Sequence, residues 1–330
     1  MSLFPFSRSP LLVLSILIIA VFGFRAFLSV PFNFRRGSIA VRRFKSRSEI
    51  SMLTFNIWFA AEKMQERMAA LGKIVENLKP DMLTFQEVTR DNLALLRQQK
   101  WFVRYHLIPP DISKEGGYFD IILTVFPVDK WHIYPFKNSP LNRKLVTAEV
   151  KRPVSSSKSP RFVIATTHLE HSGTYAQLRE EHLKESLKML STYDNVCVMG
   201  DMNIEGQFDG DVILPWQWVD AWLTLPGNTN SNGNTWDQSK NAFISKHGET
   251  SLKDRFDRGF CKLRDFKVKE MKIVGNNHTV KTSVLPSDHF GLFTVIEISS
   301  KTEEKHRKDS RTGSEVYFKR PPGWQKLIKQ

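Results

Sequence analysis

The chain has 330 residues, of which 41% are hydrophobic and 12% aromatic, enough to bury a core in one large or two small domains. Its formal net charge of +14 suggests a polyanionic partner, but the charge is concentrated at the two ends. Residues 1–48 carry +8 and residues 301–330 carry +5, which leaves the span 49–300 nearly neutral at +1. Net charge alone therefore does not make the central span a nucleic-acid-binding domain.

The N-terminal segment combines an apolar run with basic residues. Residues 11–24 read "LLVLSILIIAVFGF", a run shorter than the roughly 20 residues that span a bilayer. A second apolar piece after Arg25 extends the segment to residue 34, which is long enough for a tilted span. We therefore predict that residues 11–34 anchor the chain in a membrane. Because seven basic residues follow the run and only Arg8 precedes it, the positive-inside rule places the downstream domain on the cytoplasmic or nuclear side.

The same segment has two other interpretations. Residues 1–48 contain eight Arg or Lys and no Asp or Glu, a composition typical of a presequence for a mitochondrion or another organelle. A cleaved signal peptide also fits the apolar run, but no small-residue cleavage site follows it. In each case we predict a globular domain over 49–300 and a basic, solvated, partly disordered tail over 301–330.

The globular span begins with a predicted strand at 51–58, a helix at 62–79 and a second strand at 82–88. Apolar residues at helical spacing predict the helix, and Pro80 ends it. The later elements are a second long helix at 174–190, a polar hairpin loop at 151–161, and strands at 119–126, 145–150, 162–169, 195–200, 255–263, 266–274 and 291–298. Many strands with only two long helices favour an α/β fold in which sheets pack face to face with helices outside.

Two cysteines, Cys197 and Cys261, lie in or beside apolar runs. We therefore expect small buried side chains rather than a disulfide. No CxxC pair or Cys/His spacing indicates structural zinc, and the single glycosylation sequon at Asn277 is too common a pattern to indicate secretion.

Polar side chains recur where the predicted strands end. Residues 200–203, "GDMN", follow an apolar strand directly, and on their own they would indicate only a turn. The full set of such residues is Asn56, Glu87, His168, Asp201, Asn203, Asp257, Asp288 and His289. Because active sites on rigid scaffolds are commonly built where strand ends meet, we expect these side chains to converge.

This set suits metal-assisted hydrolysis of a phosphodiester. Mg²⁺ prefers oxygen ligands, which Glu87 and Asn56 provide, whereas no HExxH motif or three-histidine set indicates catalytic zinc. The reaction also needs a carboxylate for the attacking water and donors for the phosphoryl oxygens. Asp201, Asn203, His168 and His289 can fill these roles, and Asp257 or Asp288 could keep His289 charged.

Several motifs in this order and spacing resemble the endonuclease/exonuclease/phosphatase superfamily. They are "TFNIW", "FQEV", "THLE", "GDMN", "RFDR" and "SDHFGL". The sequences "GGYFDIIL", "WVDAW", "TWD" and "VLPSDHFGL" make the chain most similar to the 5′-tyrosyl-DNA phosphodiesterases. The resemblance covers about residues 50–298 and implies a four-layer α/β/β/α sandwich of two packed mixed sheets.

The resemblance also implies a role for each site residue. It assigns Mg²⁺, with Mn²⁺ as a substitute, to Glu87 with help from Asn56. It assigns activation of water to Asp201, phosphate contact to Asn203, and stabilisation of the transition state to His168 and His289, with Asp257 and Asp288 beside them. The substrate-binding residues that it implies are Asn203, Trp236, Tyr118 and Arg143.

The implied activity is Mg²⁺-dependent hydrolysis of a 5′-phosphotyrosyl linkage between protein and DNA or RNA, as in DNA repair. Glu205 departs from this pattern, since animal members are expected to carry Arg there, and Trp58 stands where they carry an acidic residue. The main alternative is a membrane-tethered lipid or inositol phosphodiesterase or phosphatase of the same superfamily. A non-catalytic membrane adaptor is a third interpretation, and a monomer is the default oligomeric state.

Overall fold

The computed structural model describes residues 49–151, 160–244, 252–276, 284–299, 315–322 and 324–327. The predicted membrane anchor or presequence within residues 1–48 lies outside these ranges. Among the residues that are described, the helices are all too short or too polar to cross a membrane.

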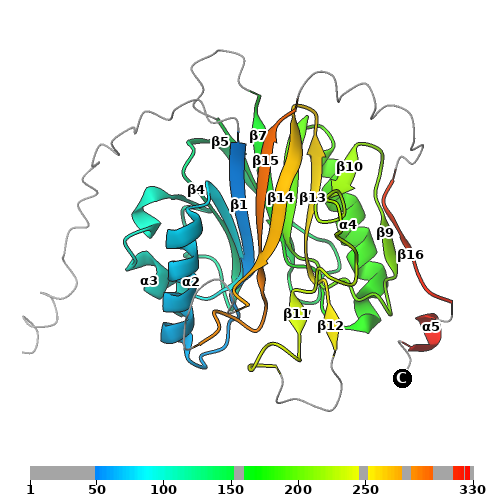
Figure 1. Cartoon of the computed structure of the whole chain (residues 1–330), viewed down its shortest axis with the longest axis horizontal. Coiled ribbons are helices and arrows are strands. Elements are labelled where there is room, and N and C mark those ends of the chain that lie inside the picture. Colours follow the sequence, from blue (N-terminus) through cyan, green and yellow to red (C-terminus); the bar gives the residue numbers. More distant parts are fainter. Residues whose placement is uncertain are drawn as a thin grey trace, which may run out of the picture. The chain divides into compact units, whose positions relative to one another are not determined.

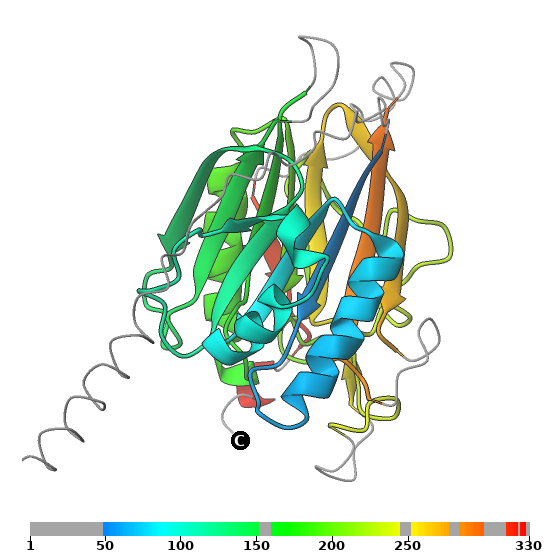
Figure 2. The same ribbon diagram turned by 90° about the vertical axis from the view of Figure 1, so that its left-hand side faces the viewer.

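Two six-stranded mixed sheets pack against each other, and helices cover their outer faces (Figures 1 and 2). One sheet has the order β14-β15-β1-β2-β4-β3 and the other has the order β10-β13-β8-β7-β6-β5. The four-layer α/β/β/α architecture expected from the sequence is confirmed.

The first sheet carries α2 and α3 on its outer face (Figure 1). Its strands are β14 (Phe266–Val274), β15 (Gly291–Ile298), β1 (Glu49–Asn56), β2 (Met82–Val88), β4 (Phe119–Thr124) and β3 (His106–Ile108), and its helices are α2 (Met64–Leu78) and α3 (Arg90–Arg97). Because side chains alternate along a strand, Leu53 and Phe55 pack against α2 while Met52 points to the other sheet. The sheet is therefore buried on both faces.

The second sheet carries α4 on its outer face (Figure 1). Its strands are β10 (Trp218–Asp220), β13 (Asp257–Leu263), β8 (Asn195–Asp201), β7 (Phe162–Thr167), β6 (Lys144–Val150) and β5 (Val128–Pro135), and its helix is α4 (Ala176–Leu190). Smaller elements are β9 (Asp211–Ile213) with β16 (Tyr317–Lys319), β11 (Trp236–Asp237) with β12 (Lys253–Asp254), 3₁₀ turns at Phe102–Arg104 and Gly173–Tyr175, and α5 (Trp324–Leu327). Leu183, Leu187 and Leu190 of α4 pack on this sheet, as their helical spacing indicates.

The prediction of two unpaired cysteines is wrong. Both side chains are buried, but Cys197 of β8 and Cys261 of β13 form a disulfide. The antiparallel register places these two residues directly opposite each other, with their Cα atoms 4.2 Å apart. The sequence shows that apolar residues surround each cysteine, but only the strand pairing shows that the two cysteines face one another.

Part of the C-terminal tail packs on the domain. Strand β16 pairs antiparallel with β9, and Val316 and Phe318 are buried in the same apolar cluster as Leu183 and Leu187 of α4. Arg320 forms an ion pair with Glu180 of α4. We expected a solvated, partly disordered extension over 301–330, whereas the described residues 315–320, called the strap below, pack against β9 and α4.

Candidate active site

The strand pairing explains why the polar residues meet. β1 runs parallel to β2, and β7 runs parallel to β8, so their carboxyl ends reach the same edge of the two sheets. β13 is antiparallel to β8 and begins at Asp257, directly opposite Asp201 at the end of β8. His289 lies just before β15, which is antiparallel to β1. Five of the predicted site residues meet here and are almost fully buried, namely Asn56, His168, Asp201, Asp257 and His289.

Asp201 is at the centre of this group. Its Oδ2 accepts a hydrogen bond from Asn56 Nδ2 at 2.9 Å, and its Oδ1 accepts one from the backbone N–H of Asn203 at 3.0 Å. His168 Nε2 and His289 Nε2 lie 3.3 Å and 3.7 Å from Oδ2. Burial would raise the pKa of Asp201, but the two histidines and the two hydrogen bonds lower it below its ordinary value. Asp201 is therefore ionised at neutral pH and can accept a proton from water.

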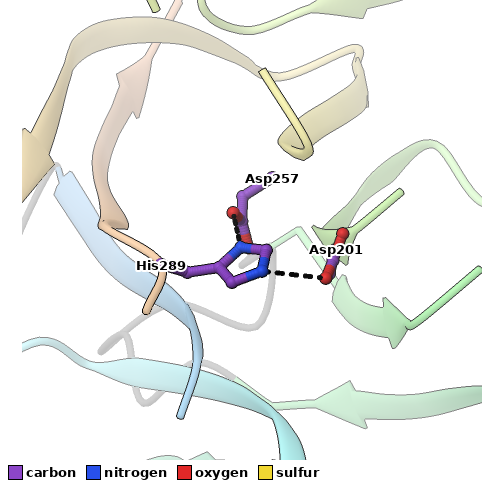
Figure 3. A group of neighbouring side chains, drawn as sticks. All are labelled: Asp201, Asp257 and His289. Atoms are coloured by element: carbon purple, nitrogen blue, oxygen red, sulfur yellow. Dashed lines mark hydrogen bonds and ion pairs between the residues drawn. The ribbon is translucent and has the colours of Figure 1, made fainter. Parts of the chain in front are cut away.

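His289 lies between two carboxylates (Figure 3). Its Nδ1 is 2.8 Å from Asp257 Oδ2, and its Nε2 faces Asp201. Burial would lower the pKa of His289, but Asp257 and Asp201 raise it well above its ordinary value. His289 is therefore held as an imidazolium, whose Nδ1–H donates to Asp257 and whose Nε2–H forms an ion pair with Asp201 at 3.7 Å.

His168 is held in the opposite charge state. Its Nδ1 lies 2.8 Å from Arg143 Nη1, and a guanidinium can only donate. Nδ1 must accept this bond, so the ring proton is on Nε2 and points toward Asp201. Burial first, and then Arg143, lower the pKa of His168 well below its ordinary value. The site thus presents a neutral imidazole on one side of Asp201 and an imidazolium on the other.

Glu87 fits a divalent cation. Its backbone has φ = 57°, a left-handed conformation that β2 adopts where its register with β4 shifts, and Phe59 N–H donates to Oε2 at 3.1 Å. Burial and the nearby carboxylate of Asp288 raise the pKa of Glu87 to about 7. A buried carboxylate next to a second one is stabilised by a hard cation, and the oxygen donors here suit Mg²⁺.

A second group of possible ligands also exists at the site. Asp201, Asp257 and His289 offer ligand atoms within 4.8 Å of one another. However, Nδ1 of His289 donates to Asp257, and an imidazolium has no free lone pair for a metal. These three residues therefore form a chain of one hydrogen bond and one ion pair, and Glu87 is a second residue that could hold a cation.

The structure gives the partners of Asn56 and Asp288. Asn56 donates to Asp201 and accepts from the backbone N–H of Trp58 at 3.0 Å, and its side chain also helps to lower the pKa of Glu87. Of the two carboxylates predicted to keep His289 charged, Asp257 accepts its hydrogen bond, whereas Asp288 accepts from Ser287 Oγ at 3.0 Å and raises the pKa of His289 through its charge.

Aromatic residues flank the site on both sides. Trp236 contacts the edge of His289, with ring centroids 4.9 Å apart. On the other side the Tyr118 ring lies 6.1 Å from that of His168, and Arg143 Cζ lies 5.4 Å from the Tyr118 ring. Phe59 stacks on Tyr118 at 5.2 Å and is 48% exposed. Sequence reasoning missed Phe59, although an exposed aromatic just after a strand end was a signal for it.

A buried arginine holds the loop that carries Phe59. Arg67 of α2 donates to the backbone carbonyls of Ile57 at 2.9 Å and Trp58 at 3.2 Å, and to that of Ala60. These bonds satisfy loop carbonyls that no strand pairs, and they fix the backbone N–H of Phe59 toward Glu87.

Comparisons with known proteins agree with this geometry. The chain is 28% identical over 254 residues to the 5′-tyrosyl-DNA phosphodiesterase of Caenorhabditis elegans, which covers 74% of this chain and 66% of that protein. The corresponding protein of Caenorhabditis briggsae is 26% identical, over 74% of this chain and 68% of its own length. The chain therefore spans about two thirds of the length of these relatives.

Solved structures show the same fold. Truncated C. elegans TDP2 has a TM-score of 0.64 at 26% identity, covering 76% of this chain and 98% of that chain. D. rerio TDP2 in complex with a single-stranded DNA product has a TM-score of 0.66 at 21% identity, covering 76% and 100%. A model of the endonuclease/exonuclease/phosphatase family matches residues 53–261, more than half of the chain. On this match and this fold, the chain belongs to the endonuclease/exonuclease/phosphatase family.

Proposed function

We propose that this chain is a divalent-metal-dependent phosphodiesterase that hydrolyses the 5′-phosphotyrosyl linkage between a protein and a nucleic acid, in DNA repair. The observation that carries the proposal is the buried carboxylate of Asp201, whose Oδ2 lies 3.3 Å from His168 Nε2 and 3.7 Å from His289 Nε2. The names of the two nematode relatives support the choice of linkage.

In this proposal the ionised Asp201 takes a proton from the water that attacks phosphorus. Once Asp201 is protonated, the Nε2–H groups of His168 and His289 are free to donate to the phosphoryl oxygens as charge builds up. Asn203, one of whose side-chain N–H groups donates to the Leu169 carbonyl at 3.0 Å, would donate its second. The bond from phosphorus to the tyrosyl oxygen then breaks, and tyrosine leaves as a phenolate, whose pKa near 10 makes protonation by the enzyme unnecessary. The products are the protein with its tyrosine hydroxyl, after the phenolate takes a proton from solvent, and a nucleic acid with a 5′-phosphate.

The metal in this proposal is Mg²⁺, for which Mn²⁺ can substitute. Glu87 would hold it, with Asn56 beside it, and the cation would supply positive charge for the phosphoryl oxygens. Tyr118, Phe59 and Arg143 form the aromatic and cationic wall against which the tyrosyl ring would lie.

The cellular location is also proposed. Residues 11–34 would tether the enzyme to a membrane with the catalytic domain on the cytoplasmic or nuclear side. The apolar run at 11–24 and the basic residues that follow it support this orientation. The alternative is import into a mitochondrion or another organelle through residues 1–48. Extraction of cell membranes at alkaline pH separates the two, because a spanning segment stays in the pellet whereas a processed, imported domain is released. We take the enzyme to be a monomer.

A second candidate is hydrolysis of a lipid or inositol phosphoester. The apolar N-terminal segment favours it, because it would keep the domain next to a lipid surface. A non-catalytic adaptor has less support, since a lost activity would leave no reason to keep an ionised Asp201 and two histidines in different charge states.

The test is Mg²⁺-dependent release of tyrosine from a 5′-phosphotyrosyl oligonucleotide by the full chain in detergent. Asp201→Asn should lower kcat by at least about 10³-fold, because the proton acceptor is lost. Asp194→Asn, which removes a half-exposed carboxylate paired with Arg264, is the matched control and should leave the rate unchanged. Hydrolysis of a lipid phosphoester without release of tyrosine would support the second candidate instead.

A further inference from the structure

The loop between β5 and β6, residues 136–143, carries Arg143 to the catalytic edge. Arg143 is the last residue of this loop, and its Nη1 lies 2.8 Å from Nδ1 of His168. Asn138 and Asn142 have φ = 58° and 54°, a left-handed conformation that asparagine adopts more readily than most residues. Because the loop lies outside the strand pairing, side chains of other elements must hold it against His168.

Glu170 holds the second half of this loop. It comes two residues after His168, and its side chain is fully buried. Its Oε1 accepts a hydrogen bond from Ser139 Oγ at 2.5 Å and one from the backbone N–H of Leu141 at 3.3 Å. Ser139 Oγ in turn accepts from the backbone N–H of Arg143 at 2.6 Å. A continuous chain of hydrogen bonds therefore runs from Glu170 through Ser139 to the backbone of Arg143.

The backbone of Glu170 is itself fixed from α4. Arg179 donates from Nη1 to the carbonyl of Glu170 at 2.9 Å and to that of Ser172 at 2.6 Å. Its guanidinium is held by Asp209, with Nη2 2.7 Å from Oδ2, and both side chains are fully buried. The carboxylate of Glu170 therefore reaches the loop from a backbone that does not depend on the loop for its own position.

The first half of the loop has a separate contact with α4. The ring of His182 stacks on that of Phe136, with centroids 4.4 Å apart, and its Nε2 lies 3.1 Å from the carbonyl oxygen of Lys137. Loss of the Glu170 side chain would leave this contact in place and would release the half of the loop that ends at Arg143. The expected effect is a local displacement of Arg143 within a folded domain.

We propose that Glu170 is a positioning residue for the reaction at Asp201. By holding Ser139 and Leu141, it keeps the guanidinium of Arg143 against Nδ1 of His168, so that the ring proton of His168 stays on Nε2 and faces Asp201. The same tie keeps Arg143 beside the ring of Tyr118, from which its Cζ lies 5.4 Å. The effect on rate rests on the proposed function, whereas the effect on His168 exists without substrate.

The first measurement is the ¹⁵N spectrum of the histidine rings in the full chain, in detergent and EDTA at pH 7. The resonance of His168 Nδ1 reports the hydrogen bond from Arg143, and Arg143→Met gives its position when that bond is lost. We expect Glu170→Ala to move the resonance from the wild-type position most of the way to that of Arg143→Met. Ser139→Ala should move it in the same direction by a smaller amount, and Ser139 is only half-buried, so this variant should fold.

Two further variants separate positioning from stability. Glu170→Gln keeps an oxygen that can accept from Ser139 and Leu141, so it should leave the His168 resonance at the wild-type position. Asn195→Ala removes a buried side chain that holds Asp265 at the opposite end of β8 from Asp201. This control should lower the thermal unfolding midpoint and leave the His168 resonance unchanged.

The second measurement is release of tyrosine from the 5′-phosphotyrosyl oligonucleotide with Mg²⁺. Glu170→Ala should lower kcat/KM by about 10²-fold and Ser139→Ala by about tenfold, because a displaced Arg143 misplaces both His168 and the wall for the tyrosyl ring. Glu170→Gln should stay within about threefold of the wild-type chain, and Asn195→Ala should match it.

Two results would overturn the positioning role. One is a wild-type His168 resonance in both Glu170→Ala and Ser139→Ala, whatever their activity, since Glu170 would then act only through stability. The other is the same displacement of the resonance in Asn195→Ala as in Glu170→Ala. A wild-type chain that releases no tyrosine would contradict the proposed function instead, and a displaced His168 resonance in Glu170→Ala would still support the tie from Glu170 to Arg143.

Discussion

His168 is neutral and His289 is charged because different side chains contact the Nδ1 atom of each ring. Asp257 accepts from Nδ1 of His289, whereas Arg143 donates to Nδ1 of His168. Each partner decides how many protons the ring carries and where they point. Asp257 and Arg143 each contact Nδ1, and in this way they set the direction of the Nε2–H group that faces the site.

Asp257→Asn should show this in a pH profile. Asp257 raises the pKa of His289, so without its charge the imidazolium loses its proton at a lower pH. The alkaline limb of kcat should therefore move to lower pH, and kcat at neutral pH should fall about 10²-fold. An unchanged profile with a lower kcat would mean that Asp257 acts only through packing.

Asp120 of β4 is a half-buried carboxylate that sequence reasoning missed. Burial raises its pKa to about 7, Asp201 and Glu87 add to this, and Arg143 opposes it. Since the folded-state pKa is above the unfolded value, its contribution to stability is fully present below about pH 4 and is lost as the pH rises to 7. Asp120→Asn should therefore stabilise the protein above pH 7 by about 1–3 kcal/mol and have little effect near pH 4. Urea unfolding at the two pH values measures this, and Asp194→Asn should show no such gain.

At the scale of the element, the long strands and helices could be predicted from the sequence and the short ones could not. α2, α4 and the central strands have strong apolar patterns, whereas β5 lies at a sheet edge with mostly exposed residues and gives a weak pattern. α3 has only eight residues and depends on a capping box at Thr89. The catalytic residues could be named because each lies at one end of an apolar strand. The pairings of Arg143 with His168 and of Cys197 with Cys261 could not, because they depend on the register between distant strands.

The strap formed by β16 should contribute measurably to stability. Phe318 is 6% exposed, whereas its neighbour Tyr317 points outward and is 52% exposed. Phe318→Ala should lower the free energy of unfolding by about 2–4 kcal/mol through lost burial and a residual cavity. Tyr317→Ala, measured by the same urea titration, should change it by less than about 0.5 kcal/mol. Equal effects of the two substitutions would mean that the strap does not pack as described.

At the scale of the whole molecule, repulsion between the carboxylates of Glu87 and Asp288 should make the stability of the fold depend on a bound cation. The proposed cation at Glu87 would relieve the repulsion from Asp288, so Mg²⁺ should raise the thermal unfolding midpoint in a concentration-dependent way. Glu87→Gln should abolish this shift, and removal of the metal with EDTA should abolish activity reversibly. A midpoint that rises equally in Glu87→Gln would place the cation elsewhere, with Asp201 and Asp257 as the next candidates.

Whether Cys197 and Cys261 are joined in a disulfide depends on the redox state of the compartment that contains the domain. Disulfides persist in oxidising compartments and are reduced in the cytosol, while the strand register keeps the two sulfur atoms opposite each other in either case. A domain that faces the cytosol should therefore carry two thiols that become reactive only on unfolding, and a domain that has crossed a membrane should carry none. Thiol labelling of Cys197 and Cys261 in unfolded protein taken from cells would therefore show on which side of a membrane the domain resides.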